Sequence, residues 1–240
     1  MYDVVIIGSG GAGLTAALTA AAAGARVLVL EASSLWGGST AVSAGEVWTP
    51  ANHCMDQLGV PDSVGDALLY CRPHALGRNP KLVEAFVVAA PAMARFVEAN
   101  SPIEWKPMTS PDTFAELPGG RLSARHLEVS PIKIGEFAPI EDNFWLPSYP
   151  TLFTNDEVFE MRLLFGGKFP QKLAQKRIED KKVCTGLGLV IGLMQGCRSL
   201  GVEFRRDSRV LRLLRQKEAG VEGVVVERDK SEETIFARQG

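Results

Sequence analysis

The chain has 240 residues, of which 46% are hydrophobic and 22% charged, and its formal net charge is −2. This length and hydrophobic content are sufficient for one or two globular domains. The nearly balanced charge lacks the basic excess of nucleic-acid-binding proteins, so we expect no nucleic-acid partner. No apolar run is long enough to cross a bilayer, and a strand predicted from residue 2 leaves no room for a signal peptide. We therefore expect a cytoplasmic protein without a transmembrane segment.

The cysteines and histidines do not form a metal-binding pattern. There is no CxxC pair, and no cysteine stands at metal-ligand spacing from a histidine. We therefore predict free thiols and no metal site. The residues concerned are Cys54, Cys71, Cys184, Cys197, His53, His74 and His126.

The first 31 residues predict a strand, a glycine-rich turn, a helix and a second strand. Residues 2–7 are an apolar run rich in β-branched side chains, and residues 26–30 are a second run of this kind. Between them lie the motif GSGGAG and an alanine-rich segment, residues 14–23. Continuous apolar strands are typical of a parallel sheet that is covered on both faces.

Within this unit, the glycine spacing indicates dinucleotide binding. Gly8 allows a sharp turn, Gly10 allows backbone to approach a pyrophosphate, and Gly13 allows the helix to pack closely on the sheet. The helix N-terminus, with Gly11 and Ala12 beside it, would face the phosphates. Glu31 follows Gly8 by 23 positions, near the spacing for an acid that binds ribose and repels the 2′-phosphate of NADP. The alternative is that the glycines serve packing alone.

A second cluster of small and hydroxyl residues favours FAD over NAD. Two glycines and two hydroxyls follow the acid and are suited to hydrogen-bond a pyrophosphate and a ribityl chain, while two later small residues would allow backbone to lie against a flat ring. Clusters of this composition are also common in ordinary loops. With Ala32, which follows the acid, the predicted cofactor-binding residues here are Gly37, Gly38, Ser39, Thr40, Ala44 and Gly45.

Residues 8–52 resemble the amino-terminal signature of the FAD-dependent oxidoreductase superfamily. Their sequence is GSGGAGLTAALTAAAAGARVLVLEASSLWGGSTAVSAGEVWTPAN. That superfamily contains fumarate reductase and succinate dehydrogenase flavoproteins, aspartate oxidases and 3-ketosteroid dehydrogenases. The WTPAN ending and SPDTFAELPGGR resemble the ketosteroid branch most closely. The resemblance implies FAD as the cofactor, with the backbone at Val210 meeting the adenine. No histidine follows Gly37 and Gly38 where covalent flavoproteins carry theirs, so we expect non-covalent FAD.

The fold expected from this resemblance is α/β. A Rossmann-like FAD-binding domain with a parallel sheet and an antiparallel β-meander would accompany part of an α+β substrate domain. Residues 1–60 and 184–240 are assigned to the FAD-binding domain, and residues 61–183 to the substrate or cap region. In the family, the last buried strand, the rest of the substrate domain and a final flavin-binding segment follow the position of Gly240. The chain is therefore expected to be an amino-terminal fragment.

The remaining segments are predicted from local signals. Asp62-Ser63 and Asn79-Pro80 precede two helical patterns, with Pro73 and Pro91 expected to break or kink them. Residues 101–152 are rich in proline and aromatic side chains, which either contact a flat substrate or anchor loops to the core. A helix is expected to begin near Asn155 and continue to Leu164, and an amphipathic helix capped by Thr185 to end at Gly201. Alternating runs after residue 208 predict a solvent-exposed antiparallel meander.

The function implied is hydride transfer between a carbon substrate and FAD, next to a ketone as in 3-ketosteroid dehydrogenases. The substrate would be small, flat and apolar, with a separate electron acceptor or donor. In the ketosteroid branch an active-site tyrosine stands in a Pro-Asp-Tyr motif, but here the third residue is Thr113. A threonine hydroxyl is a much weaker acid than a phenol, so no catalytic residue is assigned. The alternatives are fumarate-reductase-like reduction of a small unsaturated acid, or an inactive FAD-binding fragment.

Overall fold

The computed structural model describes residues 1–75, 77, 79–216 and 220–240. Strand β1 (Val4–Ile7), helix α1 (Gly11–Ala22) and strand β2 (Val27–Leu30) open the chain as predicted. With β8 (Glu203–Arg205), the strands form a parallel sheet in the order β1-β2-β8. All four residues of β2 are buried. This arrangement confirms the α/β fold class and explains the continuous apolar character of the second run.

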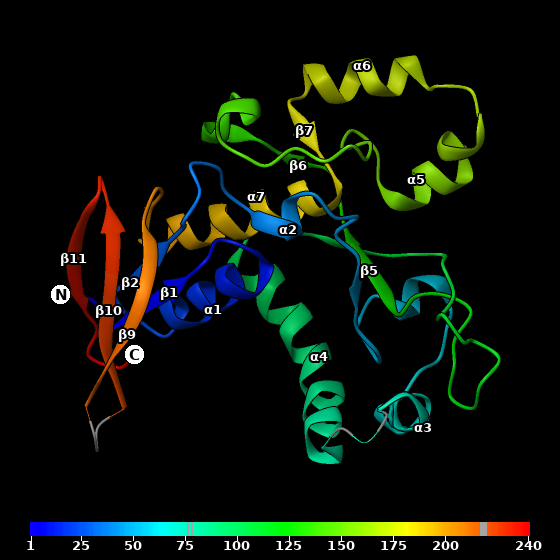
Figure 1. Cartoon of the computed structure of the whole chain (residues 1–240). Helices are drawn as coiled ribbons and strands as arrows, with labels where there is room; N and C mark the ends of the chain where they lie inside the picture. Colours follow the sequence, from blue (N-terminus) through cyan, green and yellow to red (C-terminus); the bar gives the residue numbers. More distant parts are fainter. Residues whose placement is uncertain (76, 78, 217–219) are drawn as a thin grey trace.

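The antiparallel meander is also confirmed, and it packs beside the parallel sheet (Figure 1). It is not wholly solvent-exposed, contrary to the prediction, because Val224 and Val226 are buried in a cluster with Leu28 and Leu30 of β2. It consists of β9 (Arg209–Gln216), β10 (Gly220–Arg228) and β11 (Ser231–Phe236), with β10 in the middle. Residues 237–240 then lie along β1: the Arg238 amide donates to the Tyr2 carbonyl (3.1 Å), and the Val5 amide donates to the Gly240 carbonyl (2.9 Å). The end of the described chain therefore pairs with the edge of the nucleotide-type sheet.

Helix α7 (Thr185–Ser199) lies at the centre of the molecule, packed against α1 and the short helix α2 (Gly38–Ala41). Twelve of its fifteen residues are buried, so the predicted amphipathic character is wrong. The predicted cap is also wrong, because the N-cap residue is Cys184 and makes no side-chain hydrogen bond. The Thr185 hydroxyl is buried without a hydrogen-bond partner in the part of the chain that the structure describes.

Two helices follow residues 1–60, and both begin where the sequence predicts. Helix α3 (Val64–His74) is capped by Ser63, whose hydroxyl accepts from the Asp66 amide (3.0 Å). Helix α4 (Pro80–Asn100) is capped by Asn79, with proline in its first turn and Pro91 inside it. Figure 1 shows α4 extending away from the sheets toward α3.

The proline-rich stretch forms short strands rather than one long loop. Strands β3 (Val47–Trp48), β4 (Trp105–Pro107) and β5 (His126–Val129) make an antiparallel sheet in the order β3-β5-β4. Strands β6 (Ile132–Lys133) and β7 (Lys182–Val183) pair separately. Half of the aromatic side chains of this stretch anchor it to the protein interior, since Trp105, Phe137 and Phe144 are buried, whereas Phe114 and Trp145 are exposed.

The segment between the aromatic stretch and α7 contains two further helices. Helix α5 (Asn155–Glu160) begins at the predicted residue but ends early, and Leu163–Phe165 forms a separate 3-10 turn. Helix α6 (Gln171–Glu179) carries the basic residues Lys172, Lys176 and Arg177. One large core cluster includes buried residues from both the FAD-type and the middle segments, so the division into 1–60, 61–183 and 184–240 stays a prediction. Among the described helices, none combines the length and apolar character needed to cross a membrane.

Candidate functional site

In the glycine-rich turn between β1 and α1, the fold requires glycine at some positions and not at others. Gly8 has a positive φ of 94°, a conformation that L side chains rarely adopt. At Gly13, an added Cβ would lie 2.1 Å from the Gly8 carbonyl oxygen, so only glycine allows α1 to approach the turn this closely. These two glycines are therefore required by the fold itself.

Gly10 differs from these, because nothing in the fold requires glycine there. Its backbone is extended (φ −75°, ψ 175°), and an added Cβ would make only ordinary contacts, 3.5 Å from Thr40 Oγ1 and 3.8 Å from the Gly37 carbonyl. The Cβ would therefore point toward the second glycine cluster. The first turn of α1 contains no acid and its N-cap residue makes no side-chain hydrogen bond, which suits a phosphate group at this helix N-terminus.

Ser9 connects the two glycine clusters to the predicted ribose acid. The side chain is fully buried; its hydroxyl donates to Glu31 Oε2 (2.6 Å) and accepts from the Gly37 amide (2.9 Å). The Ser9 amide also donates to Glu31, and the second carboxylate oxygen accepts from the Ser33 amide (3.0 Å). Glu31 is thus fixed at the end of β2 beside the turn. Sequence reasoning missed Ser9, because it occupies a variable position of the glycine motif.

The second glycine cluster forms the N-terminal turn of α2 and lies against α1. The Gly11 amide donates to Thr40 Oγ1 (2.9 Å), which places this threonine at the start of α1. Gly37 has φ 97° and Gly38 has φ 49°, both in the region that favours glycine. Ala12 and Ser39 are exposed beside them. The structure therefore brings together the predicted residues of both clusters and Glu31.

The predicted flavin-facing residues Ala44 and Gly45 lie after α2, where packing also demands small residues. An added Cβ on Gly45 would be 2.4 Å from the Gly186 amide nitrogen, at the start of α7. The Ala44 carbonyl accepts from the Asn155 side chain (3.0 Å). A flavin contact at these two residues stays a prediction.

Asn155 in turn depends on a buried carboxyl group. Its backbone amide donates to Glu128, a side chain that is only 1% exposed. Burial raises the pKa of Glu128, and the hydrogen bond from Asn155 offsets this only in part. The orientation of Ala44 is therefore supported by a chain of buried polar groups that sequence reasoning did not find.

The predicted adenine-binding strand lies beside the ribose acid. The Ser208 amide donates to the Glu31 carbonyl (2.9 Å), and the Asp207 amide donates to the Ser33 carbonyl (3.2 Å). Val210 follows two residues later in β9, half-buried, and Ala32 is exposed between these contacts. The start of β9 and the end of β2 thus lie side by side, and an adenine contact at Val210 stays a prediction.

A groove of about 980 Å³ opens at Trp48, three residues after Gly45. Its walls come from β3, α3, α4 and the loop at residues 113–114, and most are apolar or aromatic. Trp48 stacks with Phe86 (centroids 6.0 Å apart, 13° between planes), and His74 stacks with Phe114 (5.0 Å, 16°). We call this the aromatic groove; its main lining residues are Trp48, Tyr70, His74, Phe86, Thr113 and Phe114.

A buried ion-pair network supports the wall of the aromatic groove. Arg125 is fully buried; its guanidinium donates twice to Asp62 (2.8 and 2.7 Å) and once to Asp112 (2.8 Å). Asp112 also accepts from the Trp48 indole N–H (2.7 Å). Burial acts to raise the pKa of Asp62, but the hydrogen bonds from Arg125 and Ala51 hold it below its ordinary value. The network therefore fixes the orientation of Trp48.

The comparisons with known proteins agree with this geometry. The family model described as "FAD binding domain" matches residues 3–240. The chain belongs to the FAD binding domain family. FAD is accordingly the cofactor of this family, which confirms the cofactor expected from the sequence.

Two relatives with substantial identity are dehydrogenases. The chain is 38% identical over 143 residues to 3-oxosteroid 1-dehydrogenase of Mycolicibacterium smegmatis, covering 58% of this chain and 25% of the relative. It is 41% identical to 4-oxocyclohexanecarboxylate 2-dehydrogenase of Sinomonas cyclohexanicum over 53% of this chain and 22% of the relative. The crystal structure of 3-ketosteroid delta1-dehydrogenase from Sterolibacterium denitrificans superposes with a TM-score of 0.88 at 26% identity. The chain is covered completely there, but spans only 46% of that enzyme.

Proposed function

We propose that this chain is the FAD-holding part of a flavin-dependent dehydrogenase that oxidises a flat cyclic ketone next to its carbonyl group. The observation that carries the proposal is the aromatic groove. One of its lining residues, Trp48, follows the predicted flavin-facing residue Gly45 by three positions in the chain. The dehydrogenase relatives give the reaction class. Because the chain spans less than half of the superposed ketosteroid dehydrogenase, the complete activity belongs to a longer catalytic unit in this proposal.

In the proposed complex, the cofactor lies between the two glycine clusters without a covalent bond. The N-terminus of α1 faces the pyrophosphate, Glu31 binds the ribose hydroxyls, and the backbone near Val210 meets the adenine. Thr40, which already contacts the first turn of α1, would reach the pyrophosphate from the other side. Bound FAD supplies the hydride-accepting ring. The chain's own contribution is to bind and orient this cofactor beside the groove.

The size and chemistry of the aromatic groove support a flat apolar substrate. Its volume of about 980 Å³ is at the upper end of ligand pockets, which span roughly 300–1,000 Å³. Stacked aromatic side chains offer flat faces to a ring system. Thr113 lies in the wall, at the position where the ketosteroid branch carries tyrosine, so the proton-transferring residue must come from elsewhere.

The replacement of that tyrosine by Thr113 also favours a second candidate, reduction of a small unsaturated acid. Such a substrate needs cationic partners for its carboxylates. No arginine or lysine in the described part of the chain lines the aromatic groove, and the nearby Arg125 is already paired with Asp62 and Asp112. We therefore rank the cyclic ketone first. We further propose a cytoplasmic location, in which the four free thiols stay reduced, and a separate electron acceptor.

The first test is the visible absorption spectrum of the purified chain after incubation with FAD and gel filtration. A flavin spectrum that elutes with the protein is the expected result. Titrating this complex with a 3-ketosteroid should then perturb the flavin bands, whereas fumarate should not. A perturbation by fumarate alone would favour the second candidate. A folded protein that stays colourless would contradict FAD binding by this chain.

A further inference from the structure

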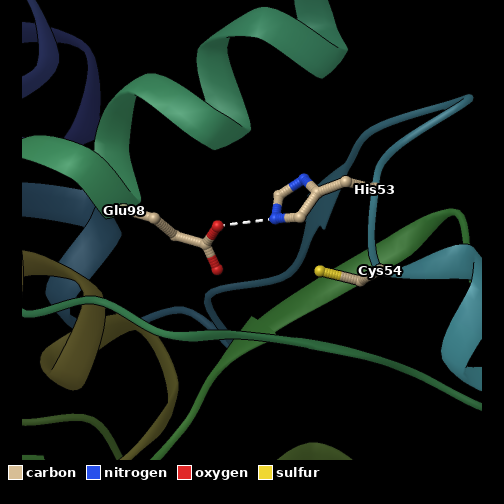
Figure 2. A group of neighbouring side chains, drawn as sticks. All are labelled: His53, Cys54 and Glu98. Carbon is tan, nitrogen blue, oxygen red and sulfur yellow. Dashed lines mark hydrogen bonds and ion pairs between the residues drawn. The ribbon is translucent and has the colours of Figure 1, made fainter.

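Three potential metal ligands converge at a point that the sequence pattern does not reveal. His53 and Cys54 are neighbours at the start of the 3-10 turn Met55–Leu58, and Glu98 lies in the last turns of α4, 45 residues after His53. One ligand atom from each lies within 4.8 Å of the other two. Figure 2 shows the imidazole, the carboxylate and the sulfur all directed into the space between the loop and the helix.

We propose that His53, Cys54 and Glu98 form a binding site for a divalent cation of the zinc class. One imidazole, one thiolate and one carboxylate are a ligand set that zinc accepts, with water as the fourth ligand. The thiolate and the imidazole disfavour magnesium and calcium, which prefer oxygen ligands. The two negative ligands would neutralise the charge of the ion.

The distances require only a small adjustment. Tetrahedral zinc with bonds of about 2.0–2.3 Å needs ligand atoms roughly 3.3–3.6 Å apart. His53 Nε2 and Glu98 Oε2 are now 2.5 Å apart in a direct hydrogen bond, so they would separate by roughly 1 Å. The Cys54 sulfur would move inward by about the same amount from its weak contact with the Trp105 carbonyl (3.9 Å).

Neighbouring groups orient Glu98 and the backbone of Cys54, whereas the buried Nδ1 of His53 has no hydrogen-bond partner among the described residues. The second carboxylate oxygen of Glu98 accepts from the Trp105 amide (3.0 Å), which orients the carboxylate. The Cys54 amide donates to the buried Asn52 side chain, which also donates to the Thr49 and Ala124 carbonyls. Such support around ligands is typical of metal sites. The opposing influence is Arg95, whose charge acts on Cys54 and would compete with a cation.

Exposure of the cluster is compatible with ion entry and a bound water. The side chains of His53 and Glu98 are 19% and 27% exposed, while Cys54 is buried behind them. A cation could therefore enter from the solvent side. The site lies apart from the predicted FAD-binding residues and is independent of the proposed function. Its effect would be structural, joining the loop after β3 to α4.

The test is zinc binding by the metal-stripped chain, measured as metal content after dialysis. The wild-type chain should retain one Zn²⁺, and X-ray absorption at the zinc edge should detect one sulfur ligand. Cys54→Ser and Glu98→Gln should each lose stoichiometric binding. Cys71→Ser, a thiol change outside the cluster, should retain it, and circular dichroism checks that each variant is folded.

Three results would overturn the proposal. The first is a wild-type chain that retains no zinc after dialysis. The second is zinc with only nitrogen and oxygen neighbours in the absorption spectrum, which requires no variant and so does not depend on their folding. The third is unchanged binding in Cys54→Ser. In each case His53 and Glu98 would be an ordinary ion pair that links the loop to the helix.

Discussion

At the scale of single residues, the glycines of one motif separate into those that serve the fold and one that does not. Gly8 is needed for its positive φ, and Gly13 is needed for the contact of α1 with the turn. Gly10 has an ordinary conformation, and an added Cβ would make only ordinary contacts. A cofactor bound against its backbone is a physical reason for glycine at this position, and it predicts that the variants behave differently.

Gly10→Val should abolish FAD binding while changing the free energy of unfolding by less than about 1 kcal/mol, within the range of substitutions away from packed features. Gly13→Ala should lose FAD and also destabilise the fold by about 1–3 kcal/mol, because its Cβ would overlap the Gly8 carbonyl. Urea unfolding and the flavin spectrum after gel filtration measure the two effects. If Gly10→Val still purifies with flavin, the cofactor does not lie against the backbone of Gly10.

The buried Arg125 is the second residue with a specific expectation. Arg125→Met removes the partner of two buried carboxylates and should cost about 3–5 kcal/mol at pH 7. Arg212→Met, which breaks an exposed pair with Glu232, should cost less than about 1 kcal/mol. Urea unfolding of both variants provides the comparison, and an equal loss for the two would show that the buried network does not contribute as described.

The cost of Arg125→Met should also depend on pH. The pKa of Asp62 is held below its ordinary value of 3.8, so this carboxylate contributes stability above that pH, and the contribution is lost as pH falls through the folded-state pKa. The difference between wild type and Arg125→Met should therefore shrink below about pH 4. Urea unfolding at pH 7 and in that acid range measures it, and a difference that grows on acidification would contradict the assignment.

At the scale of elements, helix α7 shows where local sequence signals are insufficient. Its glycines are close-contact positions: an added Cβ on Gly186 would be 1.9 Å from the Thr40 carbonyl, and one on Gly196 would be 2.6 Å from the Asn100 carbonyl. The helix is therefore surrounded by α1, α2, the end of α4 and the strands β5 and β6 rather than facing solvent. Periodicity predicts that a helix exists here, but it cannot reveal which long-range neighbours cover each face.

Gly196→Ala tests the packing of this helix. Alanine is intrinsically better in helices by about 1 kcal/mol, but overlap with the end of α4 should outweigh this and leave a net loss of about 1–3 kcal/mol. Gly65→Ala in α3 is the matched control, since Gly65 is exposed and its added Cβ would be 3.6 Å from the Ser63 hydroxyl. That variant should gain about 0.5–1 kcal/mol. Thermal unfolding of both variants would reveal whether Gly196 is a packing position.

The capped helices and the β-meander are the elements that the sequence predicts best. Ser63 and Asn79 cap helices through bonds to residues two or three positions away, so the signal is local. The position of Glu31 is similarly predicted by its spacing from Gly8. By contrast, the contacts of Ser9 with Gly37 and of His53 with Glu98 join residues that are 28 and 45 positions apart. Such pairs become visible only when the fold brings their segments together.

At the scale of the whole molecule, the predicted FAD site is assembled from distant segments. The turn before α1, the end of β2, the start of α2 and the start of β9 all meet around Ser9 and Glu31. The last described residues pair with β1, which is an edge strand of the parallel sheet β1-β2-β8. A ligand held between these segments would bind only the folded chain, and so it should stabilise the molecule as a whole.

Thermal unfolding with and without FAD tests this coupling. At a free FAD concentration 100 times its dissociation constant, the gain is about 2.7 kcal/mol, which for a chain of this size raises the midpoint by about 5–10 °C. The midpoint of Gly10→Val should not respond to FAD, because its side chain fills the gap beside Thr40. Riboflavin, which has neither pyrophosphate nor adenine, should produce little shift even in the wild-type chain. A similar shift with riboflavin would mean that the N-terminus of α1 and Glu31 are not the principal contacts.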